Sequence, residues 1–595
     1  MKNERSDYKG RGLAAFLKSK YALLPYVLIC LSALFLCIPP VQNLVISFGE
    51  RLKGRELNHL HWQRTLSFAG ITIIFFASVL FAFLLSLRHF GGIRQAVSAL
   101  NSRKAGRTYV TIFFFMLTLF VAAINISSGH DWGDDFAEYI KQGMAITNGS
   151  YATEYVNTSG FFIYPHGFPL LIAAVYKLTG FSLLAFKAIN VVMYAVFVAA
   201  LFYYCDKNLE RVTALIIAFL FSFSPCLYKL VDCILSDTCS LTFTFIALML
   251  MSFFFEEADN RKKLRLALGT GFFSSCSYIC RDSGIVLICT LFCVQLLRLA
   301  GKLRRKEWTG SLFPALACNL IPYAVFFALT FLVNNVLFPS PDRKQLGLFQ
   351  YLSPASIIAN CVYYFSLISD FFYPGFIWFA LFTAIFWAMA KSLHRDYVLI
   401  VYFLGTMALY IIWPIGGQGI RYVVSALPIL LFFAGRAAET LHASASARPM
   451  FVFDFRSYAA IAVFSCLVFM SISMVTGIRN VMFGRRLGTG SFTEEAKEMY
   501  RYIDENIADD GRIFFFKPRV LLLATGNAGV YSLPQPGQLV DTEKFDFYLH
   551  TLDHGYGQLI SDDEARQETV LLGGEEFICI HGNEKMRLFV KATLK

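Results

Sequence analysis

Hydrophobic positions along this chain are grouped into long runs that contain almost no charge and are separated by short polar stretches. A helix that crosses the hydrocarbon core of a bilayer needs about 20 mainly apolar residues, and about thirteen runs approach that length. They lie near residues 23–48, 66–87, 108–124, 182–204, 212–228, 233–255, 264–279, 284–299, 312–337, 376–390, 397–413, 422–433 and 458–475. The pattern predicts an all-α polytopic membrane protein with about 13 transmembrane helices.

The composition supports a membrane protein and argues against a soluble one. Of 595 residues, 56% are hydrophobic and only 16% are charged, whereas soluble proteins carry about 25% charged residues. The net charge of +12 comes from basic residues that lie mostly in short loops between apolar runs. Membrane topology explains them, so we expect membrane lipids and no nucleic acid as partners. The 14 cysteines form no CxxC pair and no Cys/His cluster at metal-binding spacing.

The basic loops also predict an orientation. They all fall on one side of the membrane, which the positive-inside rule makes the cytoplasmic side together with the N-terminus. The loops are 2–20, 88–107, 207–211, 261–265, 302–306 and 391–395. The first apolar run is too long for a cleavable signal peptide. An odd number of spans then places the C-terminal tail outside the cytoplasm, and we expect a multi-pass protein of the bacterial inner (plasma) membrane.

Three regions are predicted. Residues 1–107 form a cytoplasmic segment and an extra transmembrane hairpin, residues 108–476 form the transmembrane core with external loops 125–181 and 338–375, and residues 477–595 form a small extracytoplasmic α/β domain. In this tail, Ser491-Phe-Thr-Glu494 has the spacing of a capping box, which predicts a helix from there to about Ala508. Strands are predicted at 512–516, 520–524, 545–549 and 577–580.

Acidic residues are concentrated directly after the third apolar run, in the stretch from His130 to Gly143. On one continuous helix they would fall within roughly a 100° arc. The residues are Asp131, Asp134, Asp135 and Glu138. Carboxylates this close raise one another's pKa, which suits a general base or a cation site. The alternative is a solvated polar face on a helix at the membrane surface.

A second motif follows in the same loop, Tyr164-Pro-His-Gly-Phe-Pro169. Two prolines and a glycine within six residues predict a rigid turn. It could be a simple helix start with Pro in the first turn, or it could also form a stiff wall of a cavity at the membrane surface.

Together these residues resemble the integral-membrane GT-C glycosyltransferases, the group of the protein O-mannosyltransferases and the aminoarabinose transferases of lipid A. The resemblance covers roughly residues 108–595. It rests on the Asp134-Asp135 pair, Gly149-x-Tyr151, the 164–169 motif, Arg281, Arg421-Tyr422 followed by Pro428, and tail segments 502–506 and 517–519. The chain departs from the pattern in two ways: residues before 108 look like an N-terminal extension, and Asp135 stands where many members have Glu.

The resemblance implies a glycosyltransferase that moves a sugar from a polyprenyl-phosphate carrier to an extracytoplasmic acceptor, with inversion at the anomeric carbon. The acceptor could be a lipid, a glycan or a protein. Asp134 and Asp135 are then the catalytic residues. The substrate-binding candidates are Arg281 and Arg421 for the phosphate, Tyr422, Tyr164 and His166, and more weakly Arg343 and Lys344 in the second external loop.

Several alternatives stay open at this stage. Arg281 and Arg421 could instead snorkel or form structural salt bridges. A divalent cation, Mg²⁺ or Mn²⁺, could assist the acid pair, and no other cofactor is expected. A transporter or flippase would need charged residues inside the spans, but these spans are nearly free of charge. A non-catalytic assembly subunit is the third possibility, and in it the acids would be dispensable.

Overall fold

The computed structural model describes most of the chain from residue 106 onward and a short part before it. The described residues are 38–53, five single positions between 63 and 73, 106–151, 163–304, 312–339, 353–372, 376–413, 419–443, 469–470, 472–482, 490–508, 510–526, 529–530, 541–552 and 558–594. Much of the predicted N-terminal hairpin, most of the predicted span 458–475, and both Arg343 and Lys344 lie outside these ranges.

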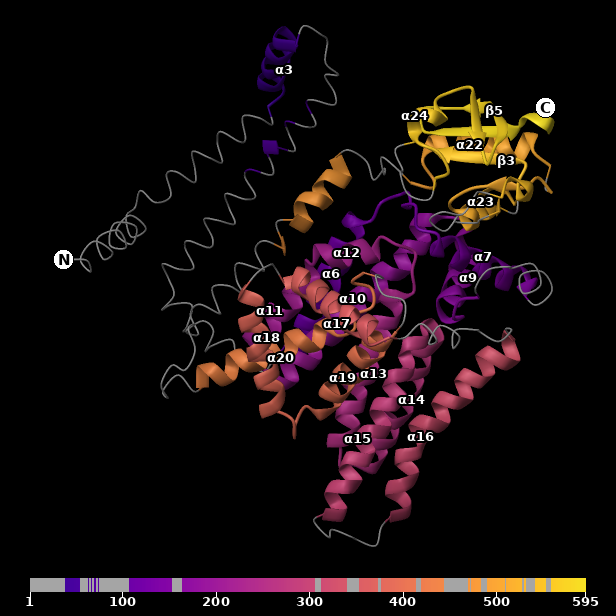
Figure 1. Cartoon of the computed structure of the whole chain (residues 1–595). Helices are drawn as coiled ribbons and strands as arrows, with labels where there is room; N and C mark the ends of the chain where they lie inside the picture. The colour runs from indigo at the N-terminus through magenta and orange to yellow at the C-terminus, as the bar shows by residue number, and fades with distance from the viewer. Residues whose placement is uncertain are drawn as a thin grey trace.

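The transmembrane region is built from helices (Figure 1). They are α3 (Pro39–Lys53), α6 (Arg107–Asn125), α7 (Asp135–Asn148), α9 (Gly167–Thr179), α10 (Leu183–Asn208), α11 (Arg211–Ser222), α12 (Pro225–Val231), α13 (Asp237–Glu256), α14 (Asn260–Cys280), α15 (Ile285–Arg304), α16 (Leu312–Phe331), α17 (Pro354–Phe372), α18 (Phe376–Lys391), α19 (Tyr397–Ile412) and α20 (Leu427–Ala443). A 3-10 turn, Asp282–Gly284, joins α14 to α15, and a π-helix, Leu332–Leu337, continues α16.

Within the described residues, five helices are long and apolar enough to cross a membrane: 107–125, 183–208, 237–256, 282–304 and 318–337. The pair α11 and α12, bent by 52° at its break, could be a sixth. Of the shorter apolar helices, Leu381–Lys391 and Tyr397–Ile412 match predicted runs, whereas Gly167–Thr179 and Pro354–Ile368 lie in the segments predicted as external loops. The protein is thus a multi-pass membrane protein, but the predicted count of about 13 spans is not confirmed.

Helix α10 runs through the main core of the transmembrane region. Its side chains pack against α6, α11 and α13, and rings such as Tyr194, Phe197 and Phe202 are fully enclosed. Helix α6 is different, because large apolar side chains along it stay exposed, including Tyr109, Ile112, Phe113, Met116 and Phe120. An exposed apolar face of this size on a long apolar helix is expected to contact lipid.

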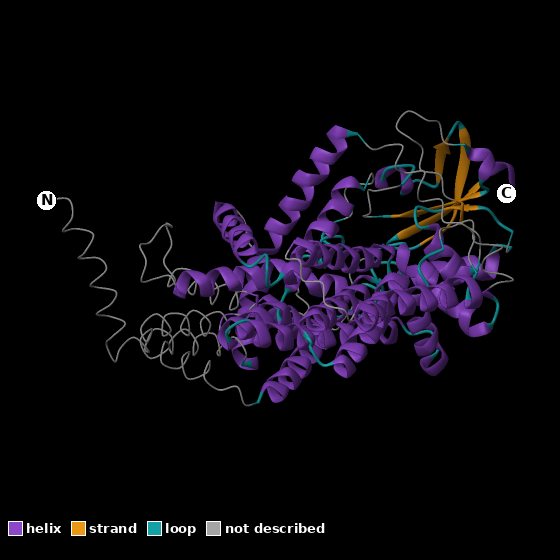
Figure 2. Ribbon diagram, turned by 90° about the horizontal axis from the view of Figure 1, so that it is seen from below, coloured by secondary structure: helices purple, strands orange, loops and turns teal. Residues whose placement is uncertain are grey.

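The C-terminal domain is a six-stranded mixed sheet with short helices, seen to one side of the helical region in Figure 2. Its elements are α22 (Glu494–Asn506), β1 (Ile513–Phe514), α23 (Pro518–Thr525), β2 (Gly529–Val530), β3 (Phe547–Thr551), α24 (Asp562–Ala565), β4 (Thr569–Leu572), β5 (Glu575–Gly582), β6 (Met586–Lys591) and two 3-10 turns, Thr542–Lys544 and Ala592–Leu594. The strand order is β2-β1-β3-β6-β5-β4. Strand β1 is parallel to β2 and β3, and the other pairs are antiparallel.

Two details of the predicted tail were wrong. The run 520–524 is part of helix α23, because Pro518 occupies the first turn of a helix, where a missing N–H costs nothing. Helix α22 is capped by Thr493, whose side chain accepts a hydrogen bond from the Ala496 N–H, and Ser491 lies before the helix. The other predicted strands overlap β1, β3 and β5, so the prediction of a small α/β unit agrees with the structure.

The domain packs onto the membrane region through a shared apolar core. Helices α7 and α9 lie directly below α23 in Figure 1. Phe136 and Ile140 of α7 belong to the same buried cluster as Phe515, Val520 and Leu521 of the domain. Burial of these side chains in one cluster fixes the position of α23 over the start of α7.

Candidate active site

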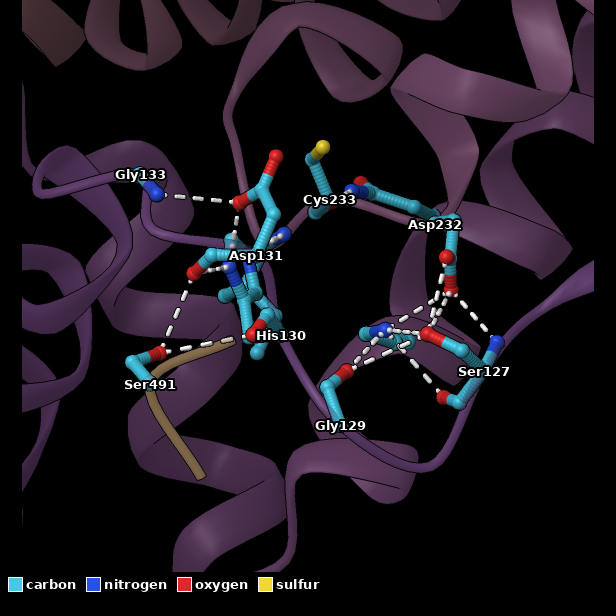
Figure 3. Close-up of polar contacts among 11 residues, drawn as sticks. Ser127, Gly129, His130, Asp131, Gly133, Asp232, Cys233 and Ser491 are labelled. Carbon is cyan, nitrogen blue, oxygen red and sulfur yellow. Dashed lines mark hydrogen bonds and ion pairs between the residues drawn. The ribbon is translucent and has the colours of Figure 1, made fainter. Parts of the chain in front are cut away.

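The segment that leads into α7 is anchored by a buried lysine. Lys187, on α10, is completely enclosed and donates to the backbone carbonyls of Ser127 and Gly129 and to the Asp232 carboxylate, at 3.1, 2.5 and 2.7 Å. Asp232 in turn accepts from the Ser127 N–H at 2.6 Å and from its hydroxyl at 2.8 Å (Figure 3). A buried charge is tolerated when it is paired and hydrogen-bonded in this way. The network holds the connection between α6 and α7 in one conformation.

The acid pair lies at the N-terminus of α7. Asp134 is the N-cap residue, Asp135 is the first residue of the helix, and Glu138 follows one turn later. Negative charge is favoured at this end of a helix by the helix dipole and the free N–H groups. Asp131 precedes the helix and pairs with His130 (Figure 3). The expected stripe of four carboxylates on one helix face is therefore wrong, because the helix begins only after Asp134.

Among the described residues, one group of side chains has the spacing of a metal site: His130, Asp131 and Cys233. Their hydrogen bonds do not suit a metal. The Ile234 N–H donates to Nε2 of His130 at 3.1 Å, so the ring proton is on Nδ1, which lies 2.8 Å from the Asp131 carboxylate. This group serves as a hydrogen-bonded anchor.

Asp135 has hydrogen-bond or ionic partners on both of its carboxylate oxygens. Its Oδ1 accepts from the Tyr164 hydroxyl at 2.6 Å and from Arg519 at 3.3 Å, and its Oδ2 accepts from Arg421 at 3.1 Å. Burial raises the pKa of this carboxyl, but the Tyr164 hydrogen bond and the two arginines outweigh burial and lower the pKa overall. Asp135 is thus a stable carboxylate and a poor proton acceptor.

Asp134 has a contrasting environment. Its Oδ2 lies 3.5 Å from Nε of Arg519, whereas its Oδ1 is buried and accepts no hydrogen bond. The side chain as a whole is 24% exposed. Burial raises the pKa of Asp134, and Arg519 and Lys517 only partly oppose this. A carboxylate with an unsatisfied oxygen and a raised pKa is suited to accept a proton.

The two predicted phosphate ligands meet at a third acid. Arg281, at the C-terminal end of α14, and Arg421, in the turn before α20, both bind Asp237 at the start of α13. Arg421 Nη2 is 3.2 Å from Asp237 Oδ2, and the Asp237 side chain is only 1% exposed. The guanidinium of Arg281 lies 4.8 Å from the centre of the Tyr422 ring. Arg421 therefore links the acid pair to the buried Asp237, and the predicted Arg421-Tyr422 segment reaches the site.

The 164–169 motif places two further predicted residues. Tyr164 binds Asp135 directly. His166 is buried behind it, with Nε2 2.6 Å from the Tyr151 hydroxyl and Nδ1 3.2 Å from Oδ1 of Asn334. Gly167 explains the close fit: a Cβ there would lie 2.7 Å from Sγ of Cys280. His166 thus supports the wall of the site and makes no contact with the acids among the interactions described for it.

Two residues of the cluster were missed or undervalued in the sequence. Asp237 is not among the catalytic or substrate-binding residues predicted above, because one acid at a helix start has no distinctive pattern. Arg519 appears only within a tail segment of the family resemblance, next to a wrongly predicted strand. Proline is typical of a helix start, so Pro518 was the available signal that Arg519 lies in the first turn of a helix.

Comparisons with known proteins agree with this architecture. Residues 164–337 match the family described as dolichyl-phosphate-mannose-protein mannosyltransferase. No curated protein matches the chain in sequence. ArnT from Cupriavidus metallidurans in the apo state has a similar structure, with a TM-score of 0.52 and 12% identity over 82% of this chain and 98% of ArnT.

Two further solved structures have the same overall fold. ArnT from Cupriavidus metallidurans bound to undecaprenyl phosphate gives a TM-score of 0.51 and 11% identity over 82% of this chain and 98% of that one. The oligosaccharyltransferase AglB from Archaeoglobus fulgidus, in complex with an inhibitory peptide and a dolichol-phosphate, gives 0.50 and 11% over 75% and 70%.

The structural matches establish the fold, and the family match covers the central helices. Together they confirm the resemblance to the GT-C superfamily of integral-membrane glycosyltransferases. The enzyme class predicted from the sequence, a GT-C type glycosyltransferase, is confirmed at that level.

Proposed function

We propose that this protein transfers a sugar from a polyprenyl-phosphate carrier to a hydroxyl or amine of an extracytoplasmic lipid, glycan or protein, with inversion. The observation that carries the proposal is the contrast within the acid pair. Asp135 has donors on both carboxylate oxygens, whereas Asp134 keeps a buried carboxylate oxygen without a hydrogen-bond partner. Neighbouring carboxyls whose pKa values are pushed apart are typical of an acid–base site.

Asp134 is the proposed general base. Its carboxylate takes the proton of the acceptor hydroxyl while the hydroxyl oxygen attacks the anomeric carbon from the face opposite the phosphate. The new carbon–oxygen bond forms as the bond from the anomeric carbon to the phosphate oxygen breaks, and the phosphate leaves with the electron pair. Attack from the opposite face accounts for the inversion.

Arg281 and Arg421 are the proposed partners of the carrier phosphate. Arg281 is 16% exposed and Arg421 is 21% exposed, while the acid that holds both is almost completely buried. Asp237 therefore keeps the two guanidinium groups together from behind and leaves part of each accessible. Two planar donors at one place suit the negative charge that develops on a leaving phosphate. Relatives in fold hold undecaprenyl phosphate or a dolichol-phosphate.

A divalent cation at the acid pair is not part of the proposal. Guanidinium nitrogens of Arg421 and Arg519 already lie 3.1 to 3.5 Å from oxygens of the two carboxylates. These groups supply positive charge at the place where a hard cation would bind, and a cation would have to displace them. The described donor set therefore does not fit a Mg²⁺ or Mn²⁺ site in this conformation.

The proposal is tested with purified protein in liposomes and a panel of radiolabelled polyprenyl-phosphate sugars, with extracted envelope lipids, glycans and membrane proteins as acceptors. We expect label to move from one donor class to one acceptor class, with an Asp134→Asn preparation as the matched blank. Analysis of the product linkage reports inversion. If the parent protein moved no label from any donor above the blank, the proposed function would be wrong.

A further inference from the structure

Arg519 reaches the acid pair from the soluble domain. It is the second residue of α23, the helix that crosses from β1 to the parallel strand β2. The N-terminus of such a crossover helix lies at the carboxyl end of a strand, the edge where α/β folds usually place functional groups. Here that edge faces α7, and Arg519 Nη1 lies 3.3 Å from Asp135 Oδ1 and 3.0 Å from the Tyr164 hydroxyl.

The position of Arg519 is fixed by contacts that do not involve its own charge. The Ser491 N–H donates to the His130 carbonyl at 3.1 Å, and the Ser491 hydroxyl donates to the Asp131 carbonyl at 3.1 Å (Figure 3). The Trp132 ring packs 5.3 Å from the Phe516 ring. At Gly490 the domain approaches so closely that a Cβ would lie 2.2 Å from the His130 oxygen.

The guanidinium of Arg519 contacts both acids at once. Its Nε faces Oδ2 of Asp134 at 3.5 Å, and its Nη1 faces Oδ1 of Asp135. The side chain is 12% exposed and its carbon lies 5.7 Å from the centre of the Tyr164 ring. A planar cation in such a position fixes the orientation of two adjacent carboxylates more firmly than a point charge would.

We propose that Arg519 is a positioning residue for glycosyl transfer, supplied by the C-terminal domain, and that it orients the Asp134 and Asp135 carboxylates for the reaction. The inference rests on the proposed function and adds a role for the soluble domain. It makes transfer dependent on the docked domain, because Arg519 of that domain is the cation that lies next to both carboxylates.

The charge balance around Asp134 predicts a second signature. The charged and titratable groups that face the acid pair are Asp135, Glu138 and Lys141 on α7, Lys517 and Arg519 at α23, Arg421 and Asp237 from the membrane region, and Tyr164. Removal of one cation from this set raises the pKa of Asp134 further. Because the base must be ionised, the pH below which the transfer rate declines should then move to a higher value.

The experiment compares Arg519→Gln, Arg519→Lys and Arg512→Gln in full-length protein, with the donor and acceptor found by the panel. Arg512 is the matched control, because it lies in the same domain, is half-exposed, and forms its ion pair with Asp546 and not with either acid of the pair. Misplacement of a catalytic group by about 1 Å can cost roughly 100-fold in rate. We expect kcat to fall about 10- to 100-fold for Arg519→Gln, with a smaller change in the KM of the donor.

The two other variants sharpen this result. Arg519→Lys keeps the positive charge and loses the planar guanidinium group. The pH at which the transfer rate falls should therefore stay near that of the parent, while kcat recovers only in part. Arg512→Gln should match the parent in kcat, KM and pH profile. Parent-like kcat and pH profile in Arg519→Gln would overturn the inference. So would a pure rise in donor KM, because Arg519 would then bind the donor phosphate.

A measurement without transfer separates this inference from the proposed function. Thermal unfolding of Arg519→Gln, Asp134→Asn and the double variant forms a double-mutant cycle. Non-additive shifts in melting temperature support the contact between the domain and the acid pair, even if the parent moved no sugar and the proposed function failed. Additive shifts would overturn the inference whatever the parent transfers.

Discussion

Two clusters of buried and partly buried charge lie at the two ends of the α6–α7 connection, and they differ in how completely their polar atoms are satisfied. Around Lys187, the ammonium group, the Asp232 carboxylate and the Ser127 hydroxyl all bind one another or backbone carbonyls. Around Asp134, three acids face three arginines, and one carboxylate oxygen has no hydrogen-bond partner. We call the Lys187 cluster closed, and we call the Asp134 cluster open because one of its hydrogen-bond acceptors is unused.

The comparison separates charge that holds the backbone in place from charge that the proposed reaction would use. A closed cluster has nothing left to offer a substrate, so its charges serve to hold the backbone in place. An open cluster carries a desolvation cost that a bound substrate can relieve. Substitutions in the first cluster should therefore affect the folded protein, and substitutions in the second should affect the reaction.

The largest effect is expected for the base. Asp134→Asn keeps the size and the hydrogen bonding of the side chain but cannot accept a proton, so the transfer rate should fall about 10² to 10⁴-fold. Donor binding should stay near that of the parent. Asp135→Asn is the matched control in the adjacent position, and it should keep more activity. A parent-like rate in Asp134→Asn would leave this cluster without a catalytic centre.

The closed cluster should respond through stability. Lys187→Met removes the cation from a completely buried position and leaves Asp232 without its ionic partner. Breaking a buried pair from one side costs about 3–5 kcal/mol, so this variant should melt well below the parent. A double variant that also carries Asp232→Asn should recover part of the loss. If Lys187→Met kept the stability of the parent but lost transfer, the Lys187 cluster would take part in the reaction and its proposed structural role would be wrong.

The arginines should show an intermediate effect on donor affinity. Hydrogen bonds to charged groups contribute about 1.5–3 kcal/mol, so Arg281→Gln or Arg421→Gln should weaken binding of undecaprenyl phosphate by about tenfold or more. Substitution with Lys should restore donor affinity only poorly at either position, because Lys lacks the planar guanidinium group that binds two phosphate oxygens at once. Arg436→Gln is a control at another partly buried ion pair, with Asp396 at 3.4 Å. Unchanged affinity in both site variants would make their pairing with Asp237 purely structural.

The pH dependence should be a moderate effect. Burial raises the pKa of Asp134 above its ordinary value of 3.8, and the protonated acid cannot act as a base. The rate of transfer should therefore decline as pH falls through a value above 3.8, while Asp135 stays ionised to lower pH. A profile of kcat/KM against pH measures this decline. An apparent pKa at or below 3.8 in that profile would contradict the assignment of Asp134 as the base.

The smallest effect is expected from chelation. Two arginines already supply positive charge to the acid pair, so EDTA should leave the rate of transfer unchanged. Loss of activity that Mg²⁺ or Mn²⁺ restores would show that a cation displaces the arginines during turnover.

Much of the fold could be predicted because its signals are local. Long apolar runs predict membrane helices, and their positions agree with α6, α10, α13 and α15. Alternating polar sequence in the tail predicts an α/β unit. The sequence did not reveal that residues 520–524 are helical, because a short apolar run fits a strand or a helix equally well. The number of spans also depends on how short helices pack, which periodicity does not report.

The amino-acid sequence by itself determined the class of this protein and the identity of the acid pair, because hydropathy and a short motif are properties of neighbouring residues. Only the tertiary structure decided which acid keeps an oxygen without a hydrogen-bond partner and which acid has donors on both oxygens. Asp135 differs from Asp134 through Tyr164, Arg421 and Arg519, which are brought together from distant segments by packing. Electrostatic interactions depend on distance and burial in space, so two adjacent identical residues acquire different chemistry only when the chain is folded.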